Sequence, residues 1–318
     1  MENKTAIVTG GSSGIGLAIC EKLLERGMKV HSISRNPPRR KGKELLHPVQ
    51  LDLSDLNAVS SFLSSFVKQN GVPDLVINNA GYGAFYEWKE FPQDEVIRQT
   101  TVLFSAPVLL CQAFAPMMEK SEKGTIVNVT SLATLFPLPY MPLYNAGKSA
   151  LSSFTQSLML EYPEYPRLID FRSGDVRTSF NRSAPKQAES GQSQSMKRAW
   201  EKIEDQLQDS PIPDVVAEQL INALKKDAMS SRSGEYRNPQ STAKPKEEGQ
   251  SHGKQSTDTR INTMFDERFP HYDGDRNTLY FSSTGLTGLG GFDIFKIEGR
   301  PGAEWGKVAN MGYPVNTS

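Results

Sequence analysis

The feature that most constrains the fold is a regular alternation of two apolar patterns along residues 4–171. Short runs rich in Val and Ile, typical of buried strands, alternate with longer segments whose apolar residues recur at helical spacing. Strands and helices that alternate in this way form a parallel sheet through right-handed crossovers. The sequence therefore predicts an α/β protein with a doubly wound parallel sheet. The predicted strands are Lys4–Thr9, Lys29–Ser34, Val49–Leu53, Asp74–Asn78, Gly124–Val129 and Leu168–Phe171.

An insertion of mostly polar residues follows the last of these strands, over residues 178–213. It contains one amphipathic stretch with Trp200, Ile203 and Leu207. A long segment beside a sheet edge is more often functional than a plain connection, so we interpret it as a substrate lid.

The C-terminal third changes composition and predicts a second, smaller region. Gly234–Arg237 begins like a further strand that stops short, and residues 238–262 are poor in apolar residues and rich in Pro, Ser and Lys. Such a composition predicts a disordered linker. Strand-like runs at Thr278–Ser282 and Phe292–Ile297, with a turn signal at residues 273–275, predict a small all-β unit. The predicted domains therefore span residues 1–237 and 263–318.

Charge and cysteine content exclude several classes of protein. Lys and Arg number 36 and Asp and Glu number 36, so the basic footprint of a protein that binds nucleic acid or an anionic membrane is missing. No apolar stretch long enough to span a membrane and no signal sequence is visible, and we expect a cytoplasmic protein. Cys20 and Cys111 lie in apolar helical patterns, which predicts buried, reduced thiols and no metal site.

A glycine-rich run, Thr9–Gly16, joins the first predicted strand to a helix. In such a loop Gly10 allows a tight turn, Gly14 lets the backbone approach a pyrophosphate, and Gly16 permits close packing of helix on strand. The free N–H groups of the helix N-terminus attract anions. A flexible turn is the alternative, but the position between a strand and a helix favours a nucleotide site.

The end of the second predicted strand bears on the choice of cofactor. Ser34 stands where an acidic residue would bind the 2′-hydroxyl of an NAD ribose, and Arg35 follows it. A guanidinium there could pair with a 2′-phosphate, which favours NADP over NAD. A solvated arginine is the alternative.

Candidate catalytic residues follow the fifth predicted strand. Tyr144 and Lys148 are four residues apart in a helical pattern and project from one face. A nearby ammonium could lower the pKa of a tyrosine from about 10, so that it exchanges a proton with a carbonyl or alcohol oxygen. Ser131 ends the strand, where it could hold the same oxygen or only cap the next turn. Asn78–Gly81 ends the fourth strand, as a plain turn or as backbone shaped to lie against a cofactor.

In this order and spacing, Thr9–Gly16, Asp52, Asn78–Gly81, Ser131 and Tyr144–Lys148 resemble the motifs of the short-chain dehydrogenase/reductase family over about residues 1–237. The resemblance implies a Rossmann-type fold, an NAD(P) cofactor, and interconversion of a carbonyl and a secondary alcohol by hydride transfer. It also implies that Tyr144 is the general acid/base, that Lys148 binds ribose and tunes Tyr144, and that Ser131 orients the substrate. Classical members are usually homodimers or tetramers. The implied cofactor-binding residues are Gly10, Ser12, Ser13, Gly14, Ile15, Gly16, Arg35, Asp52, Leu53, Asn79, Ala80, Gly81, Tyr144, Lys148, Val176 and Thr178.

Three positions depart from the family pattern. Leu103 falls where the family has a helix Asn that belongs to its proton relay, Ser173–Gly174 replaces Pro-Gly, and the strand begun at Gly234 is not completed. The alternative function is therefore a catalytically impaired, NADP-binding sensor or regulatory protein.

We expect an apolar or aromatic small-molecule substrate, in a pocket lined by aromatic side chains from several segments. The expected lining residues are Phe85, Trp88, Phe136, Tyr140, Phe180 and Trp200.

The tail resembles a single TolB-type β-propeller repeat, through Phe269–Ser283, residues 288–295, Trp305 and Pro314–Thr317. A propeller needs several blades, and here there is one copy, so we interpret the tail as a chimeric or truncated fragment. An interaction protein that acts through this tail is a third hypothesis.

Overall fold

The computed structural model describes residues 3–36, 44–178, 180, 184–226, 267–273, 277–283, 286, 293–299 and 305–311. It divides into two compact units, Met1–Glu235 and Tyr236–Ser318. The predicted linker at residues 238–262 and the strand start at Gly234–Arg237 lie outside the described residues, as does most of the turn predicted at residues 273–275.

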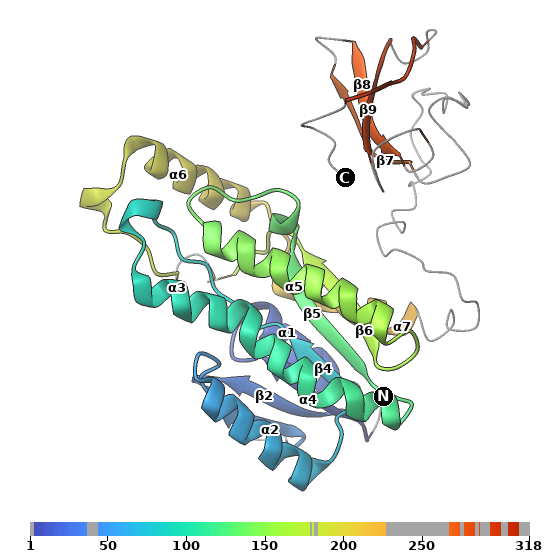
Figure 1. Ribbon diagram of the computed structural model, residues 1–318. Helices are drawn as coiled ribbons and strands as arrows, with labels where there is room; N and C mark the ends of the chain where they lie inside the picture. Colours follow the sequence, from blue (N-terminus) through green and yellow to red (C-terminus); the bar gives the residue numbers. More distant parts are fainter. Residues whose placement is uncertain are drawn as a thin grey trace. The chain divides into compact units, whose positions relative to one another are not determined.

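The first unit is built on a six-stranded parallel sheet with the order β3-β2-β1-β4-β5-β6 (Figure 1). This order is that of a Rossmann-type, doubly wound sheet, so the predicted fold class is confirmed. The strands are β1 (Thr5–Thr9), β2 (Lys29–Ser34), β3 (Leu46–Gln50), β4 (Leu75–Asn78), β5 (Thr125–Ser131) and β6 (Arg167–Ser173).

The prediction for the third strand is wrong by three residues. β3 pairs with β2 from Leu46 to Gln50, so Asp52 and Leu53 follow the strand instead of ending it. Pro48 lies inside β3 and hides the strand signal, because proline is tolerated only at sheet edges, where β3 lies.

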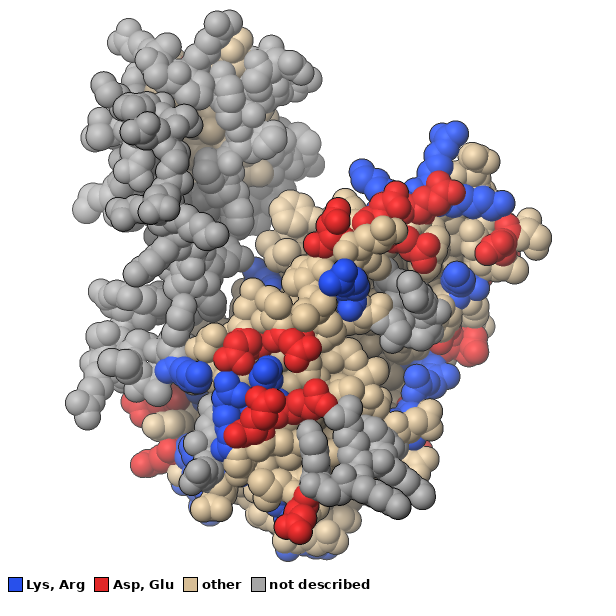
Figure 2. Space-filling view, turned by 180° about the vertical axis from the view of Figure 1, so that it is seen from behind, with Lys and Arg blue, Asp and Glu red and all other residues tan. Residues whose placement is uncertain are grey.

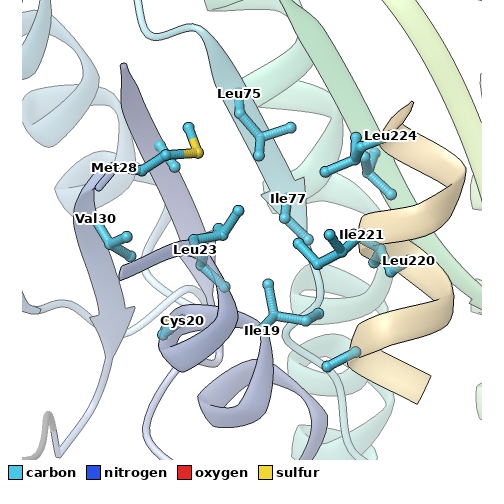
Figure 3. Close-up of a cluster of buried hydrophobic side chains, with 14 of the residues drawn as sticks. Ile19, Cys20, Leu23, Met28, Val30, Leu75, Ile77, Leu220, Ile221 and Leu224 are labelled. Carbon is cyan, nitrogen blue, oxygen red and sulfur yellow. The ribbon is translucent and has the colours of Figure 1, made fainter. Parts of the chain in front are cut away.

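Helices cover both faces of the sheet (Figure 1). On one face, α1 (Gly14–Leu24) and α7 (Pro213–Lys226) pack together over β1 and β4. Figure 3 shows the side chains that fill this layer, which are Ile19, Cys20, Leu23, Met28, Val30, Leu75, Ile77, Leu220, Ile221 and Leu224. On the other face, α2 (Leu56–Asn70), α4 (Ala106–Lys120) and α5 (Pro142–Glu161) bury a second apolar cluster. Cys20 and Cys111 are buried free thiols, as predicted.

The longest helical segment combines α3 (Gln93–Thr100), a π-helical turn (Thr101–Ser105) and α4. By length and mean hydropathy, 1.6 over its most apolar window, this segment could span a membrane, which differs from the sequence prediction. Half of that window is buried within the protein. Phe114, from α4, stacks edge-on against Phe66 of α2, so the segment also serves as a core helix.

The predicted lid contains a helix, α6 (Gln194–Gln208), preceded by a short 3-10 turn at Glu189–Gly191. Two further 3-10 turns lie at Trp88–Glu90 and Leu132–Thr134. Figure 2 shows acidic and basic side chains interleaved on the visible face, in keeping with the balanced charge.

The second unit is a four-stranded antiparallel sheet with the order β10-β9-β8-β7. Phe281, Phe295, Ile297 and Trp305 form its core. The small all-β unit is confirmed, with two strands, β7 and β10, that were not predicted; a propeller repeat stays a prediction. The strands are β7 (Glu267–Asp273), β8 (Thr278–Ser283), β9 (Asp293–Glu298) and β10 (Ala309–Asn310).

Candidate active site

The loop between β1 and α1 is a cradle shaped by its glycines. Gly10 has φ +70° and Gly14 has φ +52°, in the left-handed region that favours glycine. A Cβ on Gly16 would lie 2.2 Å from the carbonyl oxygen of Gly10. Ser13 is the N-cap residue of α1, and its side chain makes no capping hydrogen bond. The helix N-terminus therefore presents N–H groups and a hydroxyl that could bind a pyrophosphate.

The turn after β4 is fixed to the end of β1. The Thr9 hydroxyl accepts hydrogen bonds from the backbone N–H groups of Asn79 and Ala80, each 3.0 Å long. The Asn79 side chain donates to the Thr9 carbonyl oxygen, also over 3.0 Å. These hydrogen bonds fix the turn beside the glycine-rich loop, where its backbone could lie against a cofactor.

Ser131, Tyr144 and Lys148 come together where β5 ends and α5 begins. The Ser131 hydroxyl accepts the backbone N–H of Ala133 at 3.1 Å, so it caps the 3-10 turn, and it also lines the cleft together with Tyr144. Lys148 is 4% exposed, and its Nζ donates to the carbonyl oxygen of Val129 at 2.6 Å. Ser131 therefore caps the turn and lies in the cleft at the same time, so the two interpretations do not exclude each other.

The electrostatics of this group are dominated by burial. Burial raises the pKa of Tyr144, the hydrogen bond with Ser131 lowers it, and the negative charge of Asp175 raises it. Burial lowers the pKa of Lys148 to about 8, against the opposing charge of Asp170. The expected lowering of the Tyr144 pKa by Lys148 stays a prediction, and the Lys148 ammonium also donates a hydrogen bond to the β5 backbone.

Polar groups of both signs gather at the other end of the site. Asp52 accepts hydrogen bonds from the backbone N–H and hydroxyl of Ser54, at 2.9 and 2.8 Å, and lies 3.5 Å from the guanidinium of Arg98. Burial raises the pKa of Asp52, but the Ser54 hydrogen bonds and the charges of Arg98 and Arg35 outweigh it and lower the pKa. An ionised Asp52 suits a hydrogen-bond donor such as the amino group of adenine.

Sequence reasoning missed the contribution of α3 to this end. Tyr82 donates a hydrogen bond to Glu95, 2.8 Å away, and its carbonyl oxygen accepts from the buried side chain of Gln99 at 2.9 Å. Glu95 and Arg98 lie three residues apart on one face of α3. That spacing is the one sequence signal that could have indicated them, and it is common on solvated helices.

One cleft of about 470 Å³ joins all these groups. Every residue predicted for catalysis or cofactor binding lines it, although the roles of these residues stay predictions. Among the described residues, no group of three His, Cys, Asp or Glu side chains could hold a metal ion.

The predicted aromatic lining is wrong for five of its six residues. Phe180 lines the cleft, whereas Phe85, Tyr140 and Trp200 lie outside its lining. Trp88 and Phe136 are 63% and 71% exposed, on turns that face solvent. Apolar lining also comes from other side chains, of which Ile203 and Leu207 belong to the amphipathic stretch of the predicted lid. These other side chains are Leu138, Met141, Pro185, Ile203 and Leu207.

Phe85, Tyr140 and Trp200 anchor the lid. The Phe85 ring lies 4.8 Å from the Trp200 ring and 5.4 Å from the Tyr140 ring. The Phe85 backbone N–H donates to the carbonyl oxygen of Pro185 at 2.9 Å, and Lys186 lies over the Trp200 ring at 4.8 Å. Packing on these aromatics fixes α6 over the cleft, where Ile203 and Leu207 reach the lining.

Of the departures from the family pattern, Ser173 and Gly174 line the cleft, and Leu103 packs behind its lining. Leu103 is fully buried in the π-helical turn. Its side chain occupies the space against which a Cβ on Gly147 or Gly81 would pack, at 2.9 and 3.0 Å. The Ser173 hydroxyl donates to the carbonyl oxygen of Gly174 at 3.1 Å, so a local hydrogen bond stands where the family has proline.

A family model described as short chain dehydrogenase matches residues 4–189. The chain belongs to the short-chain dehydrogenase family. The prediction of an oxidoreductase of this family is thereby confirmed, and its members act on small molecules with an NAD(P) cofactor.

Relatives of this short-chain dehydrogenase include a 3-ketodihydrosphingosine reductase of Bacteroides thetaiotaomicron. It is 30% identical over 181 residues, which cover 57% of this chain and 66% of the reductase. A second relative, a short chain dehydrogenase of Pseudocercospora fijiensis, is covered over 55% of its length, so the chain spans about half to two thirds of these two relatives.

The solved structures that resemble this short-chain dehydrogenase include complexes with both kinds of cofactor. An alcohol dehydrogenase of the archaeon Thermococcus sibiricus, complexed with 5-hydroxy-NADP, is 25% identical with a TM-score of 0.56, and the match covers 70% of this chain and 90% of that one. A 4-hydroxyisoleucine dehydrogenase complexed with NADH is 27% identical with a TM-score of 0.51, over 55% of this chain and 77% of that one.

Proposed function

We propose that this protein is an NADP-dependent oxidoreductase that interconverts a carbonyl and a secondary alcohol, with Tyr144 as the general acid/base. The observation that carries the proposal is the convergence of Ser131, Tyr144 and Lys148 with the glycine cradle in one cleft. Neither group alone would distinguish an enzyme from a nucleotide-binding protein, whereas the two together provide a cofactor site and a proton donor side by side.

The cradle fits a dinucleotide by three features of this chain. The N-terminus of α1 is open, Gly10 and Gly14 remove side chains from the loop, and Asp52 offers an acceptor at the far end. The nicotinamide, when bound, supplies or accepts the hydride.

Within that arrangement, each residue of the chain has a separate task. The Tyr144 hydroxyl, which lines the cleft beside Ser131, gives a proton to the carbonyl oxygen or takes it back. The Ser131 hydroxyl holds the same oxygen in place. Lys148 provides a fixed positive charge one helical turn behind Tyr144.

NADP, more than NAD, is favoured by two guanidinium groups at the outer end of the cleft. Arg35 is exposed and follows directly after β2, and Arg98 lines the same end from α3. A 2′-phosphate carries the charge and the acceptor oxygens that such groups bind.

The substrate that we propose is a small molecule with an apolar part, held by the aliphatic lining under α6. Leu138, Met141 and Ile203 belong to this lining. The Bacteroides relative is by its name a 3-keto reductase, which supports a ketone as the reacting group. The cytoplasmic location and the homodimer or tetramer stay predictions.

The test of this function is Tyr144→Phe, with Tyr140→Phe as the matched control, because Tyr140 bonds Ser195 outside the cleft lining. We expect Tyr144→Phe to lower kcat on a panel of apolar ketones by about 10²- to 10⁴-fold and to leave NADPH affinity nearly unchanged. We expect Tyr140→Phe to keep both the wild-type kcat and the wild-type NADPH affinity. Equal turnover by the Tyr144→Phe variant and the wild type would contradict the proposal.

A second candidate function, an NADP-binding sensor with little turnover, rests on Leu103. This buried, apolar side chain leaves no polar group at the position of the family's relay Asn. Leu103→Asn distinguishes the two functions. A large gain in kcat indicates an impaired enzyme, and unchanged low turnover with clear NADPH binding indicates a sensor.

A further inference from the structure

A buried polar cluster lies directly behind the candidate catalytic residues. At its centre is Asp170 on β6, whose side chain is 6% exposed. One carboxylate oxygen of Asp170 accepts a hydrogen bond from the Thr130 hydroxyl. The other accepts from the Ser152 hydroxyl at 2.7 Å and from Nε of Arg172 at 3.0 Å. The two oxygens are thus held by donors from β5, α5 and β6 itself.

The cluster contacts the elements that hold Lys148. Ser152 is one turn after Lys148 on α5, so both side chains leave the same face of the helix. Asp170 pairs with Asn128 across β5 and β6, and the next residue of β5, Val129, accepts the hydrogen bond from Lys148 Nζ. Lys148 and the Asp170 carboxylate therefore occupy neighbouring places between α5 and the sheet.

We propose that Asp170 is a positioning residue for the reaction, and that its fixed carboxylate holds Lys148 in the charged form behind Tyr144. The proposal deepens the proposed function, on which it rests. Hydrogen bonds from Thr130, Ser152 and Arg172 orient the carboxylate.

The charges around Lys148 support this role. Burial disfavours the ammonium and lowers the pKa of Lys148 to about 8, and Asp170 is the charged group that opposes this effect. Arg172, on β6, is already paired with Asp170. On the remaining side, a Cβ on Gly81 would lie 3.4 Å from Lys148 Nζ and 3.0 Å from the apolar side chain of Leu103. Asp175 also lines the cleft, and its charge acts on Tyr144.

A role in structure alone is the competing explanation, because removing one partner of a buried ion pair is costly. Three variants separate the two. Asp170→Asn removes the charge, Arg172→Gln removes the partner and keeps the carboxylate, and the double variant removes both, so that Arg172 is not left without its partner.

The experiment is an NMR titration of full-length protein with ¹³C-labelled lysine side chains, in which the Lys148 signal is assigned from its absence in Lys148→Met. We expect a midpoint near pH 8 in the wild type. In Asp170→Asn and in the double variant, the midpoint falls by about one pH unit or more, and in Arg172→Gln it does not fall. An unchanged midpoint in the folded double variant would overturn the proposal, whatever its effect on stability.

The pH profile of ketone reduction by the same variants gives the second readout. We expect the alkaline limb of kcat to move to lower pH with Asp170→Asn and to stay in place with Arg172→Gln. A uniform loss of activity at every pH, with the limb unmoved, would also contradict the role. If the wild type reduces no ketone, the proposed function fails, and the titration still decides the charge of Lys148.

Discussion

The two halves of the cleft are made in different ways. Backbone constraints shape the cofactor half, through the positive φ of Gly10 and Gly14, the close approach at Gly16 and the turn tied to Thr9. Side chains shape the substrate half, because segments far apart in the sequence each contribute an apolar residue. A contiguous motif can encode the first kind of site, and only the folded chain assembles the second. Substitutions should therefore act on the two halves separately.

The largest expected effect is that of a single methyl group in the cofactor half. In Gly16→Ala the new Cβ would meet the Gly10 carbonyl oxygen, and backbone cannot move aside cheaply. We expect NADPH binding to weaken by about tenfold or more, with a lower Tm. Isothermal titration and thermal unfolding measure the two effects.

The control is Gly191→Ala in the 3-10 turn before α6, where a Cβ would make an ordinary contact of 3.4 Å with the Gln187 side chain. It should leave NADPH affinity and Tm unchanged. Similar losses in both variants would remove the distinction between the two halves.

The reverse test is in the substrate half. Ile203 lines the cleft from α6 and packs on the aromatic anchor of the lid. Ile203→Ala removes apolar contact area from the substrate but nothing from the cradle. We expect KM for apolar ketones to rise by about fivefold, with unchanged NADPH affinity. Steady-state kinetics with both substrates varied measures this, and Val215→Ala, an exposed apolar position on α7, is the control. Loss of NADPH affinity in Ile203→Ala would show that the halves are coupled.

A smaller effect concerns pH and the sheet beside the cofactor half. His31 is buried, its Nε2 has no hydrogen-bond partner, and its ring stacks on His47 at 4.9 Å. Burial, and then the charges of His47 and Lys29, lower the pKa of His31 from 6.5 to about 4. As pH falls below about 6.5, the unfolded chain binds this proton and the native protein does not, so stability is lost.

Between pH 7 and pH 5 the loss from His31 amounts to about 2 kcal/mol in the free energy of unfolding. Urea unfolding of the wild type and of His31→Asn at both pH values measures it, and the variant should lack this part of the pH dependence. Equal pH dependence in the two proteins would show that His31 titrates normally in the native state.

The contrast between the two halves of the cleft also explains which features of the fold and the site could be predicted from the sequence. The six strands, the cradle and the Ser131, Tyr144 and Lys148 group depend on periodicity and on short motifs, and the structure places them in one sheet and one cleft. The bounds of β3 were missed because Pro48 hides an edge strand whose pairing with β2 decides its register.

The lining of the substrate half could not be predicted for a different reason. Trp200 and Ile203 lie on the same helix. Trp200 packs on Phe85 outside the cleft lining, whereas Ile203 lines the cleft, and the sequence pattern does not distinguish these two positions. The Asp170 cluster is equally hidden, since its donors come from β5, α5 and β6. Contacts between distant segments carry no local signal in a single sequence.

The most direct test of the account is a titration of the full-length protein with NADPH and with NADH, followed by nicotinamide fluorescence and thermal shift. Binding to the native state must raise the Tm. The account predicts saturable binding of NADPH, with NADH weaker by about tenfold or more because it lacks the phosphate that Arg35 would bind. Binding of neither cofactor, or equal binding of both, would contradict the NADP site placed in the backbone-shaped half of the cleft.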